Sequence, residues 1–225
     1  MVAATSEVLR SRKMLKFKMI PTALALLGIS SAFAQYKVEP SGAPPADLAP
    51  AISALLSKTG HRIIAPDGKV WCELWFVAKE PAGPKSAESD VSWATVPHGS
   101  IIGAIRWPAP GYDRRGQMIK PGVYTLRNSL FPINGDHQGV APQRDFLLMA
   151  PASEDKSGAA IVSFDALAEL SKKASATQHP AVLSMWKVDA DFKSGMNQSG
   201  ETDWALHVKI GDASIALIVV GKVEG

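Results

Sequence analysis

The sequence contains a single cysteine, Cys72, so an intramolecular disulfide framework is excluded. No two histidines lie within five residues of one another, and H-E-x-x-H and C-x-x-C are both missing, so the common local zinc motifs are absent. Cys72 also lies too early in the chain for a cupredoxin copper site, which groups Cys, His and Met near the C-terminus. We therefore interpret Cys72 as a small core residue on a strand.

The sequence also lacks the short motifs that mark several enzyme classes. G-x-S-x-G, the nucleophile elbow of α/β-hydrolases, is missing. The phosphate-binding patterns G-x-x-x-x-G-K-[ST] and G-x-G-x-x-G are missing as well. A Ser/His/Asp triad assembled from distant residues leaves no local trace, so whether the protein is an enzyme stays open, with the balance against it.

An excess of charge is also missing once the N-terminus is set aside. The formal net charge of the whole chain is +3, but residues 1–34 contain five of the basic residues and one acidic residue. Residues 35–225 therefore hold 19 basic and 20 acidic residues, a net charge of −1. A neutral chain offers no electrostatic basis for binding nucleic acid or anionic lipid, so we expect no nucleic-acid partner.

Residues 1–34 resemble a secretory signal peptide. Basic residues precede an apolar run that closes on Ala32-Phe33-Ala34, the small-residue pattern of a cleavage site. The run is shorter than the ~20 residues that span a bilayer, so we expect no stable membrane insertion after the leader is removed. Met14 opens a complete leader of its own, and we interpret residues 1–13 as an over-extended start. The predicted location is periplasmic or secreted.

The remaining chain reads as one β-rich domain. Residues 35–46 are rich in proline and predict an extended linker, followed by a single domain at 47–225. A hairpin is predicted at 61–79 around Pro66-Asp67-Gly68, and a tight one at Gly211-Asp212. Further strands are predicted at 100–107, 122–128, 144–150, 159–164, 181–188, 203–211 and 213–223, short helices at 48–56 and 163–174, and a surface loop at 79–90. The fold class is mainly β: one antiparallel β-sandwich, or a barrel-like domain, with two short helices.

Two polar loops are the candidate ligand-binding sites. The first contains Asp113, Arg114 and Arg115 and ends at Gly116. The second runs from 134 to 146, and its candidate residues are Asp136, His137 and Arg144. Glycines let the backbone approach a ligand closely, but Asp and Gly are also ordinary turn formers, and the arginines can pair with nearby carboxylates. The sequence leaves both interpretations open.

An alternative reading gives the second loop a divalent metal. A carboxylate beside an imidazole, as in Asp136-His137, suits metal ligation or proton transfer. His98 and His179 would complete the ligand set if their loops lie at the same end of the domain. Otherwise we expect no cofactor.

The aromatic residues and one strand motif bear on the choice of partner. Trp71 and Trp75 would share a strand face about 13 Å apart, as in a glycan platform, although core packing is the favoured explanation. The stretch GQMIKPGVYTLR, with Gly122, Tyr124 and Leu126, resembles a Gly-x-Tyr-x-Leu signature of small secreted bacterial proteins of unknown function. The GKVW of 68–71 and the late hairpins are similar too, and transthyretin-like modules share the element. The resemblance implies a β-sandwich outside the cytoplasm and no assigned activity.

The sequence thus predicts a non-catalytic β-sandwich that binds a small ligand, a glycan or an envelope protein. A metal-binding protein or metal-assisted hydrolase built on Asp136 and His137 is the alternative. In the predicted strand after Gly122, alternation places Tyr124 and Leu126 on the buried face and Val123 and Thr125 on the opposite one.

Overall fold

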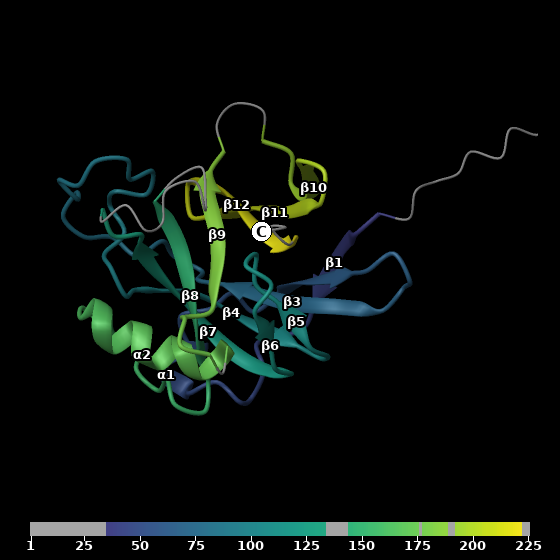
Figure 1. Cartoon of the computed structure of the whole chain (residues 1–225), viewed down its shortest axis with the longest axis horizontal. Helices are drawn as coiled ribbons and strands as arrows, with labels where there is room; N and C mark the ends of the chain where they lie inside the picture. The colour runs from purple at the N-terminus through teal and green to yellow at the C-terminus, as the bar shows by residue number, and fades with distance from the viewer. Residues whose placement is uncertain (1–34, 134–143, 176, 189–191, 222–225) are drawn as a thin grey trace, which may run out of the picture. The chain divides into compact units, whose positions relative to one another are not determined.

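A computed structural model describes residues 35–133, 144–175, 177–188 and 192–221. The predicted signal peptide, together with Asp136 and His137, lies outside the described residues. Figure 1 shows the described part, which is dominated by one antiparallel sheet. Neither of its two helices, α1 (Pro50–Ser53) and α2 (Phe164–Ser175), is long and apolar enough to cross a membrane.

The sheet contains ten strands in the order β1-β2-β3-β4-β7-β8-β9-β12-β11-β10, and a separate two-stranded ribbon pairs β5 with β6. The bounds are β1 Lys37–Ser41, β2 Gly60–Ile64, β3 Val70–Phe76, β4 Ile101–Trp107, β5 Gly111–Tyr112, β6 Met118–Ile119, β7 Gly122–Leu130, β8 Asp145–Pro151, β9 Val182–Lys187, β10 Gly195–Ser199, β11 Asp203–Ile210 and β12 Ala213–Val220. The edge strands β1 and β10 approach one another, so the sheet is nearly closed into a barrel. The predicted mainly β, antiparallel, barrel-like fold with two short helices is confirmed.

The alternation of side chains along β7 explains the core. Tyr124 and Leu126 are buried in the main hydrophobic cluster, and Leu126 pairs with Met149 of β8. Thr125 and Arg127 point to the other face, and both are buried as well. The buried face of Tyr124 and Leu126 is therefore confirmed, while the opposite face is also covered.

The cover on that face is the segment after β8. Asp155 accepts hydrogen bonds from Arg127 Nε and Nη2, both at 2.7 Å, and from the Thr125 hydroxyl. Arg127 also donates to the carbonyl oxygens of Gly99, Ser157 and Ala159. Arg127 is 0% exposed, so this ion pair lies entirely within the protein.

Two predictions on secondary structure are corrected by these contacts. Residues 159–164 do not form a strand: both neighbouring positions beside β8 are occupied by β7 and β9, and Arg127 takes the Ala159 carbonyl. Residues 37–41, within the predicted linker, pair with β2 as β1. Pro40 is tolerated there because β1 is an edge strand, where a missing N–H costs no ladder bond on the open side.

The helices follow the sequence pattern to different degrees. The predicted helix at 48–56 shortens to α1, and β2 begins at Gly60. The predicted helix at 163–174 is confirmed as α2, with the Ser163 hydroxyl capping it by accepting the Ala166 N–H at 3.3 Å. Leu167 of α2 packs on β8 and β9, which places the helix across one side of the sheet (Figure 1).

The tryptophans of β3 belong to the core. Trp75 is 2% exposed, and its indole donates to the Gly42 carbonyl at 2.7 Å. Trp71 donates to the carbonyl of Val219 at 2.8 Å and packs edge-on against Trp107. With both indoles turned to protein groups, these residues form no open platform, and core packing is the correct interpretation.

Candidate functional site

The first polar loop is the tip of the β5–β6 ribbon, and its carboxylate is buried. Asp113 Oδ1 accepts the main-chain N–H groups of Arg115 and Gln117, at 3.0 and 2.9 Å. Its Oδ2 accepts the Gln117 side-chain amide at 2.6 Å. Burial raises the pKa of Asp113, against the opposing effect of these hydrogen bonds and of the Arg115 charge. Asp113 therefore organises the loop from within.

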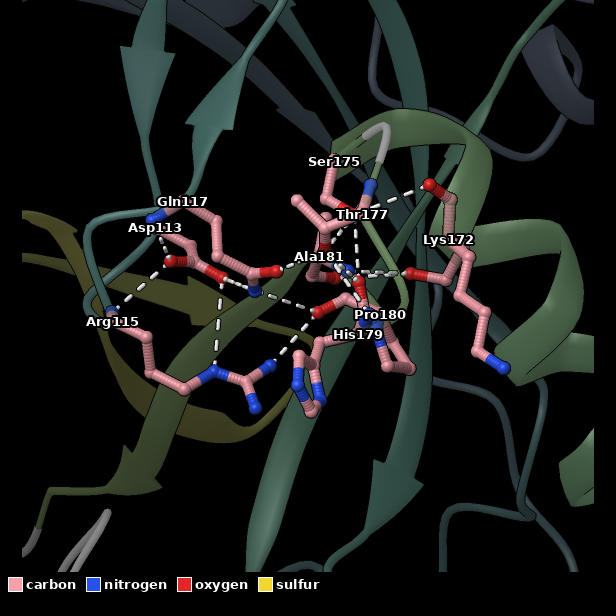
Figure 2. Close-up of polar contacts among 10 residues, drawn as sticks. Asp113, Arg115, Gln117, Lys172, Ser175, Thr177, His179, Pro180 and Ala181 are labelled. Carbon is pink, nitrogen blue, oxygen red and sulfur yellow. Dashed lines mark hydrogen bonds and ion pairs between the residues drawn. The ribbon is translucent and has the colours of Figure 1, made fainter.

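The same loop docks on the chain that leaves α2. Figure 2 shows Arg115 and Gln117 reaching the Pro180 carbonyl, at 2.8 and 3.2 Å. On the other side, the Thr177 hydroxyl donates to the Gln117 side-chain oxygen. The contacts join segments more than 60 residues apart in the chain.

Arg114, the third charged residue of the loop, also forms an ion pair. Arg114 Nε donates to Asp203 Oδ2 at 3.0 Å, which ties the loop to the start of β11. Each of the three charged residues predicted as ligand-binding in this loop thus contacts protein groups. Their role in ligand binding stays a prediction, and their contacts within the protein are now explained.

The second polar loop is represented in the described residues by Arg144. Its Nε donates to the Phe131 carbonyl and its Nη1 to the Ser89 carbonyl, both at 2.9 Å. Its Nη2 donates to Glu88 Oε2 at 2.6 Å. Arg144 therefore holds the segment around Glu88 against the end of β7.

His98 lies beside the same end of β7. Its Nδ1 is 3.3 Å from the Ser129 hydroxyl, and its ring faces Phe164 with a centroid distance of 6.1 Å. The buried Nε2 makes no hydrogen bond of normal geometry with the described residues, although the Ser163 main chain lies close enough to interact with the ring. Burial lowers the pKa of His98, an effect that the nearby Ser163 carbonyl and the Glu88 charge partly offset. The ring is thus favoured in its neutral form.

The contact between His98 and Ser129 does not make a catalytic pair. Ser129 is 0% exposed, so a substrate cannot reach its hydroxyl. The hydroxyl orients the imidazole ring, as a supporting hydrogen bond does for a histidine with a binding role.

His98 and Arg144 line one cleft, which we call the His98 cleft. Its volume is about 460 Å³, and its walls are Glu88, His98, Leu130, Pro132, Ile133, Arg144, Val162 and Phe164. Three apolar side chains of these walls are exposed to solvent: Val162 is 84% exposed, Ile133 71% and Phe164 40%. The cleft thus combines exposed apolar surface with the ring of His98.

Of the four predicted metal ligands, the structure describes His98 and His179, and it does not bring these two together. His98 contacts Phe164, the first residue of α2, whereas the His179 carbonyl accepts the hydroxyl of Ser175, the last one. A helix of 12 residues is about 18 Å long. Within residues 35–133, 144–175, 177–188 and 192–221, no three His, Cys, Asp or Glu side chains cluster as metal ligands. The metal alternative therefore depends on Asp136 and His137.

Cys72 has no place in a reactive site. It is 0% exposed, and burial together with the Glu73 charge raises the pKa of its thiol. A thiol that is hidden and protonated is a poor nucleophile and a poor metal ligand, which confirms its interpretation as a core residue.

Sequence reasoning singled out His98 and Arg144 but missed the apolar part of the cleft. Val162 and Phe164 fell within a stretch expected to be a strand, where alternating apolar residues are normally buried. The predicted helix cap gives no warning of this exposure: an apolar residue just before a capping serine usually packs against the fourth helical residue, here Leu167. Val162 instead points outward while Leu167 is buried, which leaves an apolar side chain without a use in the fold.

Comparison with known proteins adds no relative: the chain matches no known family, no curated protein and no solved structure.

Proposed function

We propose that this protein is a non-catalytic binding module that holds a small, largely apolar ligand in the His98 cleft. The observation that carries the proposal is the convergence of Ile133, Val162 and Phe164, all exposed, on the walls of one cleft beside the His98 ring. Small-molecule sites are typically apolar clefts of about 300–1,000 Å³ with a few placed polar groups, and the His98 cleft has that size and composition.

The composition of the cleft also supports one class of partner among those predicted from the sequence. A glycan needs flat aromatic faces and many hydrogen-bonding groups, whereas the cleft walls are mainly Leu, Ile, Val, Pro and Phe. An apolar small molecule fits these walls better than a glycan. We therefore place the small ligand first and keep the envelope protein as a second partner that would cover the same exposed side chains.

The proposed ligand site can be tested with the neutral fluorescent probe N-phenyl-1-naphthylamine. We expect saturable, blue-shifted fluorescence with the wild type and about tenfold weaker binding in Phe164→Ser, because removing one buried aromatic contact costs about 1.4 kcal/mol or more. Tyr112→Ser is the matched control, since Tyr112 is an aromatic residue of similar exposure, 46%, outside the cleft. Equal binding by all three proteins would refute the site.

We further propose that the module acts outside the cytoplasm after loss of residues 1–34. The support is the Ala32-Phe33-Ala34 pattern after a basic and apolar N-terminus. N-terminal sequencing of exported protein should begin at Gln35. Recovery of the intact N-terminus in the membrane fraction would contradict this proposal.

A further inference from the structure

The His98 cleft contains one pair of opposite charges. Glu88 and Arg144 are the charged side chains of its walls, and they form an ion pair at 2.6 Å. The remaining polar wall residue is His98, whose neutral form is favoured by burial. Among the described residues, any charge selection by the cleft therefore depends on this one pair.

The two partners of the pair are held very differently. The Arg144 side chain is 15% exposed, and the carbonyl oxygens of Phe131 and Ser89 fix its guanidinium independently of Glu88. The Glu88 side chain is 55% exposed, and within the described residues it accepts a single hydrogen bond, from Arg144. The cation is thus anchored in the wall, whereas the anion sits at the surface of the exposed segment before Trp93.

Replacing the Glu88 carboxylate on Arg144 by another carboxylate would cost little free energy. An exposed carboxylate that leaves an ion pair is solvated by water, which compensates most of the lost attraction. The guanidinium keeps its two carbonyl contacts during the exchange and stays oriented toward the cleft. A second carboxylate can then accept the same Nη2–H group, since Arg binds carboxylates through directed hydrogen bonds.

We infer that the His98 cleft selects amphiphilic monoanions: a ligand carboxylate replaces Glu88 on Arg144, and the ligand's apolar chain covers Ile133, Val162 and Phe164. Glu88 is then an internal competitor that lowers the affinity for anionic ligands. This inference rests on the proposed function, because it names the ligand class of the same cleft. The ligand needs an apolar chain next to its carboxylate, as in a medium-chain fatty acid.

The experiment compares displacement of N-phenyl-1-naphthylamine by decanoate and by decan-1-ol, which share a chain and differ in charge. In Glu88→Gln we expect decanoate to bind about two- to fivefold more tightly and decan-1-ol to bind as in the wild type, the range that an exposed ion pair supports. Glu154→Gln is the matched control, because Glu154 pairs with Lys173 and is 43% exposed, away from the cleft. It should change neither affinity.

Arg144→Gln gives the complementary result. It should remove the preference for decanoate over decan-1-ol, while Glu88→Gln provides the decisive comparison if Arg144→Gln fails to fold. An unchanged decanoate-to-decanol ratio in Glu88→Gln overturns the inference and leaves the proposed function intact, because decan-1-ol still displaces the probe. If neither compound displaces the probe from the wild type, the proposed apolar site itself is wrong.

Discussion

The Asp113 loop and the His98 cleft are the two polar regions of this protein that invite a functional reading, and they differ in where their hydrogen-bonding capacity goes. In the loop, Asp113, Arg115 and Gln117 bond to one another and to the Pro180 carbonyl. In the cleft, one buried nitrogen of His98 makes no hydrogen bond of normal geometry with the described residues, and apolar side chains stay exposed beside it.

The difference shows that density of charge is a poor guide to a binding site. A loop with several charges must satisfy them when it packs, because burying an unpaired charge or donor is expensive. The Asp113 loop has largely done so: Arg115 Nε is buried without a hydrogen bond but lies 3.9 Å from Asp113 Oδ2, and the loop has little left for a ligand. The cleft has fewer charges, and the apolar side chains that the fold leaves exposed there are available for binding.

The Arg127–Asp155 pair is a fully buried ion pair within the protein, and its loss should cause the largest decrease in stability. Arg127→Met should lower the free energy of unfolding by about 3–5 kcal/mol, because Asp155 would remain buried without its counter-charge. Urea unfolding measures the change. Lys173→Met is the control, since its ion pair with Glu154 is exposed and should contribute no more than about 1 kcal/mol. Equal losses in the two variants would contradict the buried network.

The Asp113 loop should show an intermediate effect. Asp113→Ala should destabilise the protein by about 1–3 kcal/mol, because the buried N–H groups of Arg115 and Gln117 lose their acceptor. Asp113→Asn should lose less, since its Oδ1 can still accept both main-chain donors. Glu201→Ala, on an exposed turn, is the control in urea unfolding. If Asp113→Ala unfolds at the wild-type urea concentration, the loop is not held as described.

His98 should contribute less to stability than Asp113 or Arg127, and its contribution should depend on pH. Burial lowers the pKa of His98 below its ordinary value of 6.5, so the unfolded chain binds a proton more readily than the folded protein. This contribution to stability is present above the unfolded pKa and is lost as the pH falls below it. Thermal unfolding between pH 7.5 and 5.5 should therefore show a decline that is shallower in His98→Asn.

Part of the decline should persist in that variant, because burial also lowers the pKa of His61 and of His207. His179→Asn, with its exposed ring, is the control. A pH profile of His98→Asn that matches the wild type would show that the His98 ring is not shielded from water.

The smallest effect is expected from metal ions. His98 and His179 lie near opposite ends of α2, so zinc, copper or calcium should leave the melting temperature unchanged in the wild type and in His137→Ala. Binding to a true site would stabilise the folded state by about 2.7 kcal/mol at a hundredfold excess over the dissociation constant. A metal-dependent rise that disappears in His137→Ala would favour the metal-dependent alternative.

The elements that the sequence predicted well are those whose causes are local. The turn at Pro66–Gly68 brings β2 and β3 together, and Gly211 closes β11 on β12 with a φ of +60° that glycine adopts freely. The Ser163 cap begins α2 where expected. In each case the residue and its effect lie within a few positions of one another.

The candidate site could be predicted only in pieces. His98 and Arg144 were singled out for different loops and different chemistries, and nothing in their spacing indicates that they line one cleft. The exposure of Val162 was not predicted, because the apolar pattern of 159–164 also fits a strand. A residue's exposure depends on which neighbours reach it, and those neighbours come from β7, α2 and the segments around Glu88 and Arg144.

By itself, the sequence determined the mainly β class, the hairpins, the capped helix and the buried face of Tyr124 and Leu126, because hydrophobic alternation and turn chemistry act over short distances. Long-range contacts instead make Lys37–Ser41 an edge strand, keep 159–163 out of the sheet, and dock the Asp113 loop on Pro180. Each of these outcomes depends on a backbone group whose partner lies far away in the chain. A buried donor or acceptor must find such a partner, and only the assembled sheet fixes which one is within reach.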